Sequence, residues 1–399
     1  GFGRPIFMTK NELILLPILK ANRGAGGGYV LTRKYLEGAR EYARTWPGPV
    51  TTLAEFTATR STDLDHVEVH PADLDTGLET RPATQAALAA RIGDAAVALA
   101  YLCREEEPTA RLCAELGVPL VFTSEYSHET ERQIIDATVR NPLVRVRRRY
   151  WMWNAQRSCR RSLALAAGLQ CSGTPTYEAF RDLQPEALLF FDNRVRAEDV
   201  IPEAALEGKL AGLRAGRALR LVFGGRLIAM KGVMDLPKIA QRLKALEVPF
   251  SLEIYGSGPL EDALRQSVEA LGLVDEVALK GALDFRTGWI AALKDRADLF
   301  LCCHPQGDPS STYPEVMSCG VPIAGYANAA FRGIVAQSGS GFLTPLKSPA
   351  ALAAEVARLH NARDELVQAA HAARDFALAH TFEKTFRRRT EHLIAASRL

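Results

Sequence analysis

Two cations follow a pair of glycines in the C-terminal half of the chain. Gly224 and Gly225 end a short apolar run, and the next stretch holds Arg226 and Lys231. The glycines allow the backbone to approach a ligand closely. Cations on a loop, backed by the amides of a following helix, suit a diphosphate. The alternative is that both cations are solvated loop charges.

Further along the chain, small polar residues precede a glutamate. Ser310, Ser311 and Thr312 would leave backbone amides free to meet a phosphate at the start of a helix. Glu315 would then project toward a ribose, because a carboxylate can accept hydrogen bonds from two hydroxyls. The alternative is a capping box, in which Glu315 only satisfies the amide of Thr312.

The elements that must position these residues alternate between strands and helices. We expect strands over 220–223, 250–255, 277–280, 298–303 and 321–324, with helices over 234–246, 260–271, 287–296 and around Glu315. This alternation predicts βαβ units with a parallel sheet. A glycine turn, Gly256 to Gly258, follows the second strand and is common in such proteins. Since ligands of parallel sheets bind at the C-terminal strand ends, one ligand could touch all three segments.

Three motifs in this order resemble a known family. They are Val222-Phe223-Gly224-Gly225-Arg226-x4-Lys231-Gly232, Ile254-Tyr255-Gly256-Ser257-Gly258-Pro259 and Pro314-Glu315-Val316-Met317-Ser318-Cys319-Gly320-Val321-Pro322-Ile323. The run from Leu221 to about Leu346 resembles the second domain of family-4 glycosyltransferases of the GT-B fold. The resemblance implies an α/β protein with two Rossmann-like domains facing each other across a cleft.

The resemblance also implies roles for these residues. Arg226 and Lys231 would bind the donor diphosphate, Glu315 would bind the ribose, and the backbone of Ser310, Ser311 and Thr312 would hold the sugar or phosphate. Gly225, Gly256 and Gly258 complete the expected donor site of this half. Transfer in the family retains the anomeric configuration and requires no metal ion, so we expect no cofactor.

One position departs from the family pattern. The family carries two glutamates spaced E-x7-E, and the place of the first is taken by Gly307, with Asp308 next to it. Asp308 could contact the sugar through a shifted loop, or the sugar could be held differently. A weakened or inactive enzyme is therefore an alternative.

The N-terminal half should supply the acceptor site. Gly26, Gly27 and Gly28 follow an expected strand over 13–19 and precede an expected helix over 29–42. They resemble the glycine-rich first loop of the GT-B fold, which faces the donor phosphates and the acceptor. We therefore include Gly27 and Gly28 in the donor site.

A second loop of this half carries titratable side chains. Glu125, His128 and Glu129 follow an expected strand over 119–123, so we expect them to point into the cleft. Many family members carry a cleft histidine from this domain, and His128 is the candidate by position. The alternative is a histidine on a surface loop.

A long basic helix is expected over 145–167. Seven arginines lie between 145 and 161 without an acidic residue, together with Tyr150, Trp151 and Trp153. This composition suits the headgroup level of an anionic membrane, and a lipid-linked acceptor would explain it. The alternative is a helix whose aromatic face packs into its own domain.

Length and composition limit the remaining choices. The 399 residues, 47% apolar and 24% charged, indicate a globular protein of two domains. We expect an acceptor domain over 1–192, a nucleotide-sugar domain over 193–375 beginning with a linker to 216, and a helix over 376–399 packing back toward the N-terminal domain. A net charge of +3 does not indicate nucleic-acid binding.

The seven cysteines form no C-x-x-C pair and favour a reducing compartment. The apolar run at 13–19 is shorter than the ~18 residues that span a bilayer. We therefore expect a cytoplasmic protein without a transmembrane helix, peripheral at the inner membrane face if the helix at 145–161 contacts lipid.

The expected function is transfer of a sugar from a nucleotide-diphosphate sugar to a carbohydrate, lipid-linked acceptor or polysaccharide precursor. One alternative is a catalytically silent nucleotide-sugar-binding subunit, and another is a same-fold epimerase or hydrolase. A dinucleotide dehydrogenase is excluded, because no G-x-G-x-x-G opens a βαβ unit with an acidic residue ~20 positions later.

Overall fold

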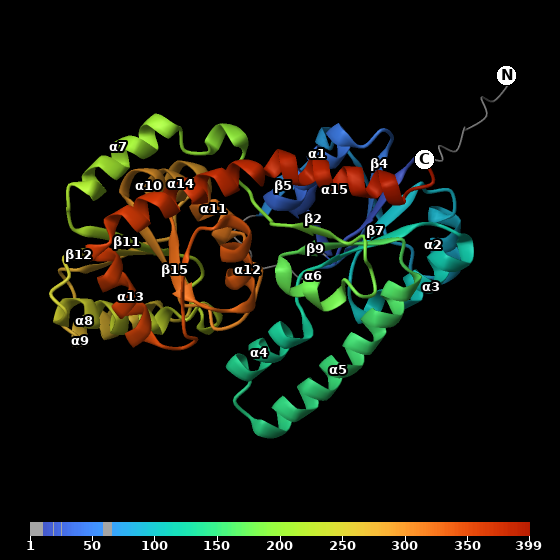
Figure 1. Ribbon diagram of the computed structural model, residues 1–399. Helices are drawn as coiled ribbons and strands as arrows, with labels where there is room; N and C mark the ends of the chain where they lie inside the picture. The colour runs from blue at the N-terminus through green and yellow to red at the C-terminus, as the bar shows by residue number, and fades with distance from the viewer. Residues whose placement is uncertain (1–10, 19, 25, 59–65) are drawn as a thin grey trace, which may run out of the picture.

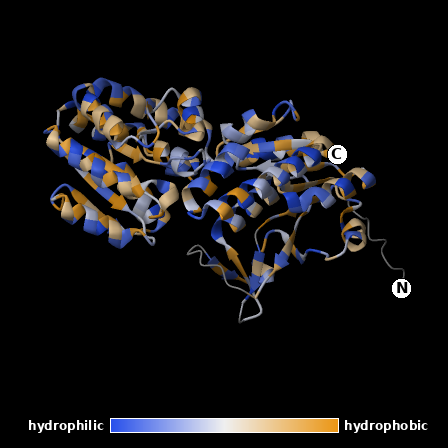
Figure 2. Cartoon of the chain, turned by 90° about the horizontal axis from the view of Figure 1, so that it is seen from below, coloured by the Kyte–Doolittle hydropathy of each residue, from blue (hydrophilic) through white to orange (hydrophobic). Residues whose placement is uncertain are grey.

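The computed structural model describes residues 11–18, 20–24, 26–58 and 66–399. It consists of two α/β halves that lie side by side, with helices on the outside of each sheet (Figure 1). The strands are mainly hydrophobic, whereas the helices alternate between hydrophilic and hydrophobic residues (Figure 2). Each helix therefore buries one face against a sheet and exposes the other.

The N-terminal sheet contains ten strands among the described residues. They are β1 (Leu13–Leu16), β2 (Lys20–Arg23), β3 (Tyr29–Thr32), β4 (Val50–Phe56), β5 (His66–Val69), β6 (Gly77–Thr80), β7 (Val97–Tyr101), β8 (Leu120–Ser124), β9 (Gly168–Ser172) and β10 (Leu188–Phe190). The order is β10-β9-β8-β7-β1-β4-β2-β3-β5, and β6 pairs with β4. The strands from β10 to β4 run parallel, so β1, β7 and β8 end at the same edge.

In the described part of the N-terminal half, six α-helices accompany this sheet. They are α1 (Arg33–Thr45), α2 (Gln85–Ile92), α3 (Glu107–Leu116), α4 (His128–Thr138), α5 (Pro142–Leu165) and α6 (Thr174–Phe180). Helices α4 and α5 project away from the rest of the domain as a helical hairpin (Figure 1).

The expected helix over 29–42 is wrong in its first turn. Residues Tyr29–Thr32 form β3, which runs antiparallel to both β2 and β5. Helix α1 begins at Arg33, because the Thr32 side chain accepts a hydrogen bond from the Tyr35 amide at 3.2 Å and caps the helix. The glycine-rich segment before Tyr29 is therefore the turn of a β-hairpin.

The C-terminal sheet is parallel throughout, in the order β13-β12-β11-β14-β15-β16. Its strands are β11 (Leu219–Gly224), β12 (Phe250–Tyr255), β13 (Val277–Gly281), β14 (Leu299–Cys302), β15 (Ile323–Tyr326) and β16 (Phe342–Thr344). The helices are α7 (Glu203–Arg214), α8 (Leu236–Ala245), α9 (Glu261–Ala270), α10 (Ala291–Arg296), α11 (Thr312–Ser318), α12 (Ala329–Ser338), α13 (Pro349–Asn361), α14 (Arg363–Ala379) and α15 (Phe382–Ala396). The order reverses between β11 and β14, which makes this the topological switch point.

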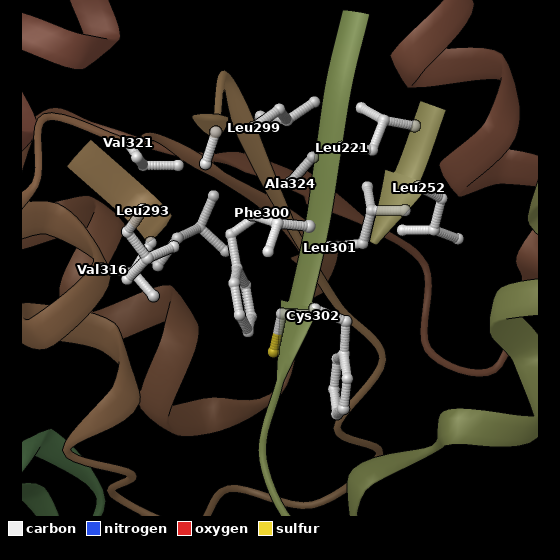
Figure 3. Close-up of a cluster of buried hydrophobic side chains, with 14 of the residues drawn as sticks. Leu221, Leu252, Leu293, Leu299, Phe300, Leu301, Cys302, Val316, Val321 and Ala324 are labelled. Carbon is white, nitrogen blue, oxygen red and sulfur yellow. The ribbon is translucent and has the colours of Figure 1, made fainter. Parts of the chain in front are cut away.

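The core of this half fixes the direction of α11. Leu221 of β11, Leu252 of β12 and the side chains of β14 pack into one apolar cluster, which Val316 of α11 joins (Figure 3). Val316 is fully buried. Because neighbouring helical residues point about 100° apart, burying Val316 leaves Glu315 at the side of the helix.

One segment, the expected linker, differs from the expected organisation, and the last helix follows it. The expected linker up to residue 216 contains α7, which buries Leu206, Leu210 and Leu213 in the core. Helix α15 crosses to the N-terminal half and lies against α1 (Figure 1). There the Phe386 and Tyr42 rings are 5.1 Å apart.

Candidate donor and acceptor site

The two expected donor cations lie at the switch point of the C-terminal sheet. Arg226 and Lys231 follow β11, and Asp308 lies in the loop after β14, the next strand in the sheet. The Lys231 ammonium is 2.9 Å from the Asp308 carboxylate, and both side chains are largely buried. The Arg226 side chain is exposed. Lys231 is thus held in place by the protein, whereas Arg226 is available to a ligand.

The glycines around these cations are required by contacts between backbone segments. A Cβ atom on Gly256 would lie 1.8 Å from the Gly225 carbonyl oxygen, and one on Gly232 would lie 2.0 Å from the Cys303 carbonyl oxygen. Gly258 packs in the same way against the Leu227 carbonyl, at 2.6 Å. The loops after β11, β12 and β14 therefore touch each other and form one surface.

A buried polar network, which the sequence did not reveal, supports Asp308. His304 and Gln306 are 1% and 0% exposed, and the Gln306 amide donates to the Asp308 carboxylate at 3.0 Å. Burial would raise the pKa of the Asp308 carboxyl, but His304 and Lys231 outweigh burial and lower it. Burial and the nearby Lys231 lower the pKa of His304 to about 3. Asp308 is therefore an ionised partner of Lys231.

The Thr312–Glu315 capping box is not formed. Helix α11 begins at Thr312 with Ser311 as its N-cap residue, and the Thr312 hydroxyl hydrogen-bonds to Ser310 at 3.0 Å. Glu315 is buried, and burial raises the pKa of its carboxyl although Ser311 hydrogen-bonds to it. The carboxyl of Glu315 therefore does not satisfy the Thr312 amide as a capping box would require.

Some of the backbone amides before α11 already donate hydrogen bonds within the loop. Ser310 donates its amide hydrogen to the Asp308 carbonyl oxygen at 2.9 Å, and the Thr312 amide donates to the Ser310 hydroxyl at 3.4 Å. Within the described part of the chain, the Ser311 amide makes no hydrogen bond. Ser311 is therefore the strongest backbone donor of this segment for a phosphate.

Gly307 lies in the seam between the two halves. Its carbonyl oxygen accepts a hydrogen bond from Thr130 of α4 at 3.3 Å, and its amide donates to Gln133 at 3.1 Å. A Cβ atom on Gly307 would lie 3.0 Å from the Ala329 Cβ and 3.1 Å from the Thr130 hydroxyl. The absence of a glutamate at this position therefore allows α4 to approach the loop after β14.

We expect Gly307→Glu to disturb the seam rather than to restore a sugar contact. The added side chain must displace α4 or α12, at a cost of about 1–3 kcal/mol typical of overpacking. A lower melting temperature together with weaker donor turnover is the expected result. Gly307→Ala, which adds one methyl group, should have a smaller effect of the same sign. A stable Gly307→Glu variant with higher turnover would contradict this assignment.

The N-terminal wall of the cleft carries Glu125, which follows β8 directly. Glu125 is half-buried, and burial raises the pKa of its carboxyl, with Lys34, Asp192, Asp308 and Lys231 as its charged neighbours. Lys34 forms an ion pair with Asp192. Lys34, Glu125, Asp192 and Arg194 line a cavity of about 190 Å³. The cleft therefore contains groups from both halves.

His128 and Glu129 are exposed residues in the first turn of α4. Glu125 lies among the charges of both halves, whereas a role of His128 in the cleft stays a prediction. The signal of Glu125 in the sequence was its position directly after a strand.

The glycine-rich turn connects β2 with β3. Gly27 has a φ of 82°, and a Cβ on Gly28 would lie 2.8 Å from the Val69 carbonyl oxygen of β5. Since β2 separates this turn from β1, it is not the loop that directly follows the first strand. Contact of Gly27 and Gly28 with a donor stays a prediction.

The basic helix forms as α5, and its aromatic residues do not pack into the domain. Trp151 and Trp153 are 56% and 47% exposed. Arg104 lies over the Trp151 ring at 5.1 Å. Two arginines pair with acidic residues of other elements, Arg149 with Asp136 and Arg161 with Glu107. The helix therefore presents both aromatic and cationic side chains to solvent.

Among the described residues, no group of three or more His, Cys, Asp or Glu side chains is arranged to hold a metal ion. No helix in the same part of the chain has the length and apolar character needed to cross a bilayer.

Comparison with known proteins agrees with this architecture. Residues 213–376 match the family described as "Glycosyl transferases group 1". A 2-deoxystreptamine N-acetyl-D-glucosaminyltransferase from Streptomyces fradiae is 29% identical over 153 residues. That alignment covers 38% of this chain and 36% of the relative, so the chain matches only about a third of the relative's length.

Solved structures match over nearly the whole chain. HepE of Anabaena, in complex with UDP, aligns with a TM-score of 0.64 at 14% identity, covering 96% of this chain and 100% of HepE. Sucrose-phosphate synthase from Thermosynechococcus elongatus aligns with a TM-score of 0.65 at 15% identity, covering 96% and 98% of the two chains. The chain has the GT-B fold, as its motifs predicted.

Proposed function

We propose that the protein transfers a glycosyl group from a nucleotide-diphosphate sugar to an acceptor hydroxyl. The observation that carries the proposal is the switch point, where Lys231 lies within electrostatic reach of Glu125 and Arg226 within reach of Tyr126. The match of residues 213–376 to group 1 glycosyltransferases supports it. A cleft with anion-binding groups on one side and a carboxylate on the other suits transfer between two bound substrates.

In the proposed reaction, the acceptor oxygen bonds to the anomeric carbon while the bond from that carbon to the diphosphate oxygen breaks. The nucleoside diphosphate leaves, and the Glu125 carboxylate takes up the proton of the acceptor hydroxyl. Arg226 and Lys231 stabilise the charge that develops on the leaving diphosphate. We propose retention of configuration and no requirement for a metal ion.

The remaining donor contacts follow from the positions of the side chains. Glu315 would accept hydrogen bonds from the ribose hydroxyls, and the Ser311 amide would meet a phosphate or the sugar. Asp308 would act mainly by orienting Lys231, because the carboxylate is already engaged with that ammonium. Direct contact of Asp308 with the sugar is the alternative role.

Two other functions make different predictions in the same assay. A silent binding subunit would bind the nucleotide but show neither transfer nor slow donor hydrolysis. An epimerase or hydrolase of this fold would turn over the donor without an acceptor. Product analysis with and without acceptor therefore separates the three functions.

We expect the protein to bind nucleoside diphosphates, and we expect Glu315→Gln to lower its affinity for them. Calorimetric titration with UDP, GDP and ADP is the direct test, with UDP first because HepE was crystallised with it. Loss of a charged hydrogen bond should reduce affinity about tenfold or more, whereas the melting temperature should change little because Glu315 is not part of a capping box. No binding of any of the three nucleotides would contradict the proposed function.

We also propose peripheral contact of α5 with an anionic membrane. Flotation with vesicles of phosphatidylcholine and phosphatidylglycerol at low salt should carry the protein upward. Reversing the charge of Arg147 and Arg148, both exposed on α5, should reduce flotation at least tenfold. The matched control is Arg181→Glu with Arg242→Glu, which reverses two exposed arginines elsewhere. Equal flotation of both variants, or none of the wild type, would remove the membrane contact.

A further inference from the structure

A large cavity lies beside the cleft, between α4, α5 and the ends of β7 and β8. Its volume is about 470 Å³, which is within the range of about 300–1,000 Å³ typical of small-molecule sites. Met152 and Cys159 of α5 and Ile134 and Ile135 of α4 form apolar parts of its wall. The cavity is therefore large enough for a sugar-sized ligand.

Carboxylates outnumber cations in the lining of this cavity. Glu105, Glu125 and Glu131 line it, against the single guanidinium of Arg104, which lies over the Trp151 ring. Glu131 accepts a hydrogen bond from Gln156 at 3.0 Å. Burial raises the pKa of Glu131, as it does for Glu125. Among the described residues Glu131 forms no ion pair, and a largely buried carboxylate without a counter-ion is costly unless a cation binds to it.

The walls provide aromatic surfaces beside these carboxylates. Tyr101, Tyr126 and Trp151 line the cavity. Aromatic faces can pack against the C–H face of a saturated ring and attract an ammonium group. The combination of aromatic faces and carboxylates suits a ring that carries hydroxyls and a positive charge.

The cavity joins the donor site through the residues that follow β8. Glu125 borders both this cavity and the cavity of about 190 Å³, and Tyr126 lies within electrostatic reach of Arg226 and Asp308. A neighbouring cavity of about 400 Å³ is lined instead by apolar residues with Lys34 and Arg389. Those cations would repel an ammonium group. The charge pattern therefore selects the cavity under α5 for a cationic ligand.

We propose that the cavity between α4 and α5 binds an acceptor that carries a protonated amine, of the amino-sugar or aminocyclitol class. The proposal rests on the proposed glycosyl transfer and specifies its acceptor. The amine would pair with Glu131, with Glu105 nearby, while the ring lies against Trp151 and its hydroxyl reaches Glu125.

The test compares two sugars that carry, at the same position, either an ammonium group or an uncharged acetamide. Glucosamine and N-acetylglucosamine would be titrated against the full chain near neutral pH, with UDP present, and followed by ligand-observed NMR. We expect glucosamine to bind at least about tenfold more tightly, as charged hydrogen bonds imply. Glu131→Gln should abolish this preference and leave UDP affinity unchanged. Glu129→Gln, an exposed neighbour on the same helix, is the control and should behave as wild type.

Several outcomes would overturn the inference. They are equal binding of the two sugars, no binding of glucosamine at its highest soluble concentration, and a preference that persists in Glu131→Gln. The UDP titration in the same samples separates this failure from that of the proposed function. UDP binding without an amine preference contradicts only the inference, whereas loss of UDP binding in the wild type contradicts the proposed function.

Discussion

Replacing Lys231 by methionine should lower both the affinity for nucleoside diphosphates and the free energy of unfolding. Lys231 is largely buried and 2.9 Å from Asp308. Removing the ammonium loses a charged contact to the diphosphate, about 1.5–3 kcal/mol. It also leaves the Asp308 carboxylate buried without its cation, which costs about 3 kcal/mol of stability. Calorimetry with UDP and denaturant unfolding measure the two effects separately.

Two further variants distinguish binding from stability. Lys231→Met combined with Asp308→Asn should regain most of the lost stability, because the unpaired charge is gone, but should not regain affinity. Arg226→Ala should weaken binding by a similar amount and leave unfolding unchanged, because the Arg226 side chain is exposed. Unchanged UDP affinity in both single variants would remove the diphosphate assignment.

Glu125→Gln should reduce the rate of transfer by about 100-fold or more, the range typical of losing a general acid or base. Gln keeps the shape of the side chain but cannot take up a proton. Glu125 follows β8 at the cleft and is the N-terminal carboxylate whose charged neighbours include Lys231 and Asp308. The measurement is kcat with saturating donor and acceptor, together with UDP affinity, which should not change.

His128→Ala is the matched comparison, because His128 lies three positions further on and is exposed. If Glu125 is the group that acts on the acceptor, His128→Ala should lower kcat less than tenfold. A large loss in His128→Ala with little effect in Glu125→Gln would assign the role to the histidine instead.

The C-terminal half was largely predictable because its signals are local. Strand β12 has the predicted bounds of 250–255. Strands β11 and β14 differ from the predicted ranges, 220–223 and 298–303, by one residue at each end. Apolar runs of strand length between amphipathic helical stretches depend only on neighbouring residues. The order of β11, β12 and β14 then brings the glycine loops together.

The N-terminal half was less predictable for a physical reason. Tyr29–Thr32 pairs with β5 some forty residues away, and that pairing makes it a strand rather than the first turn of a helix. Likewise Leu206, Leu210 and Leu213 follow helical spacing, but the Ala-rich stretch around them was interpreted as a linker. Their burial against the C-terminal core makes α7 part of that domain.

The sequence by itself predicted the parallel sheet and the GT-B fold. It also predicted that Arg226 and Lys231 follow one strand and that Glu315 lies in the short helix after a later strand. The tertiary structure alone decided what these groups contact. It paired Lys231 with Asp308, placed Gly307 against Thr130 of the other domain, and brought Glu125 near the charges of Lys231 and Asp308. Such contacts join residues far apart in the chain, and they depend on how two packed domains meet rather than on local spacing.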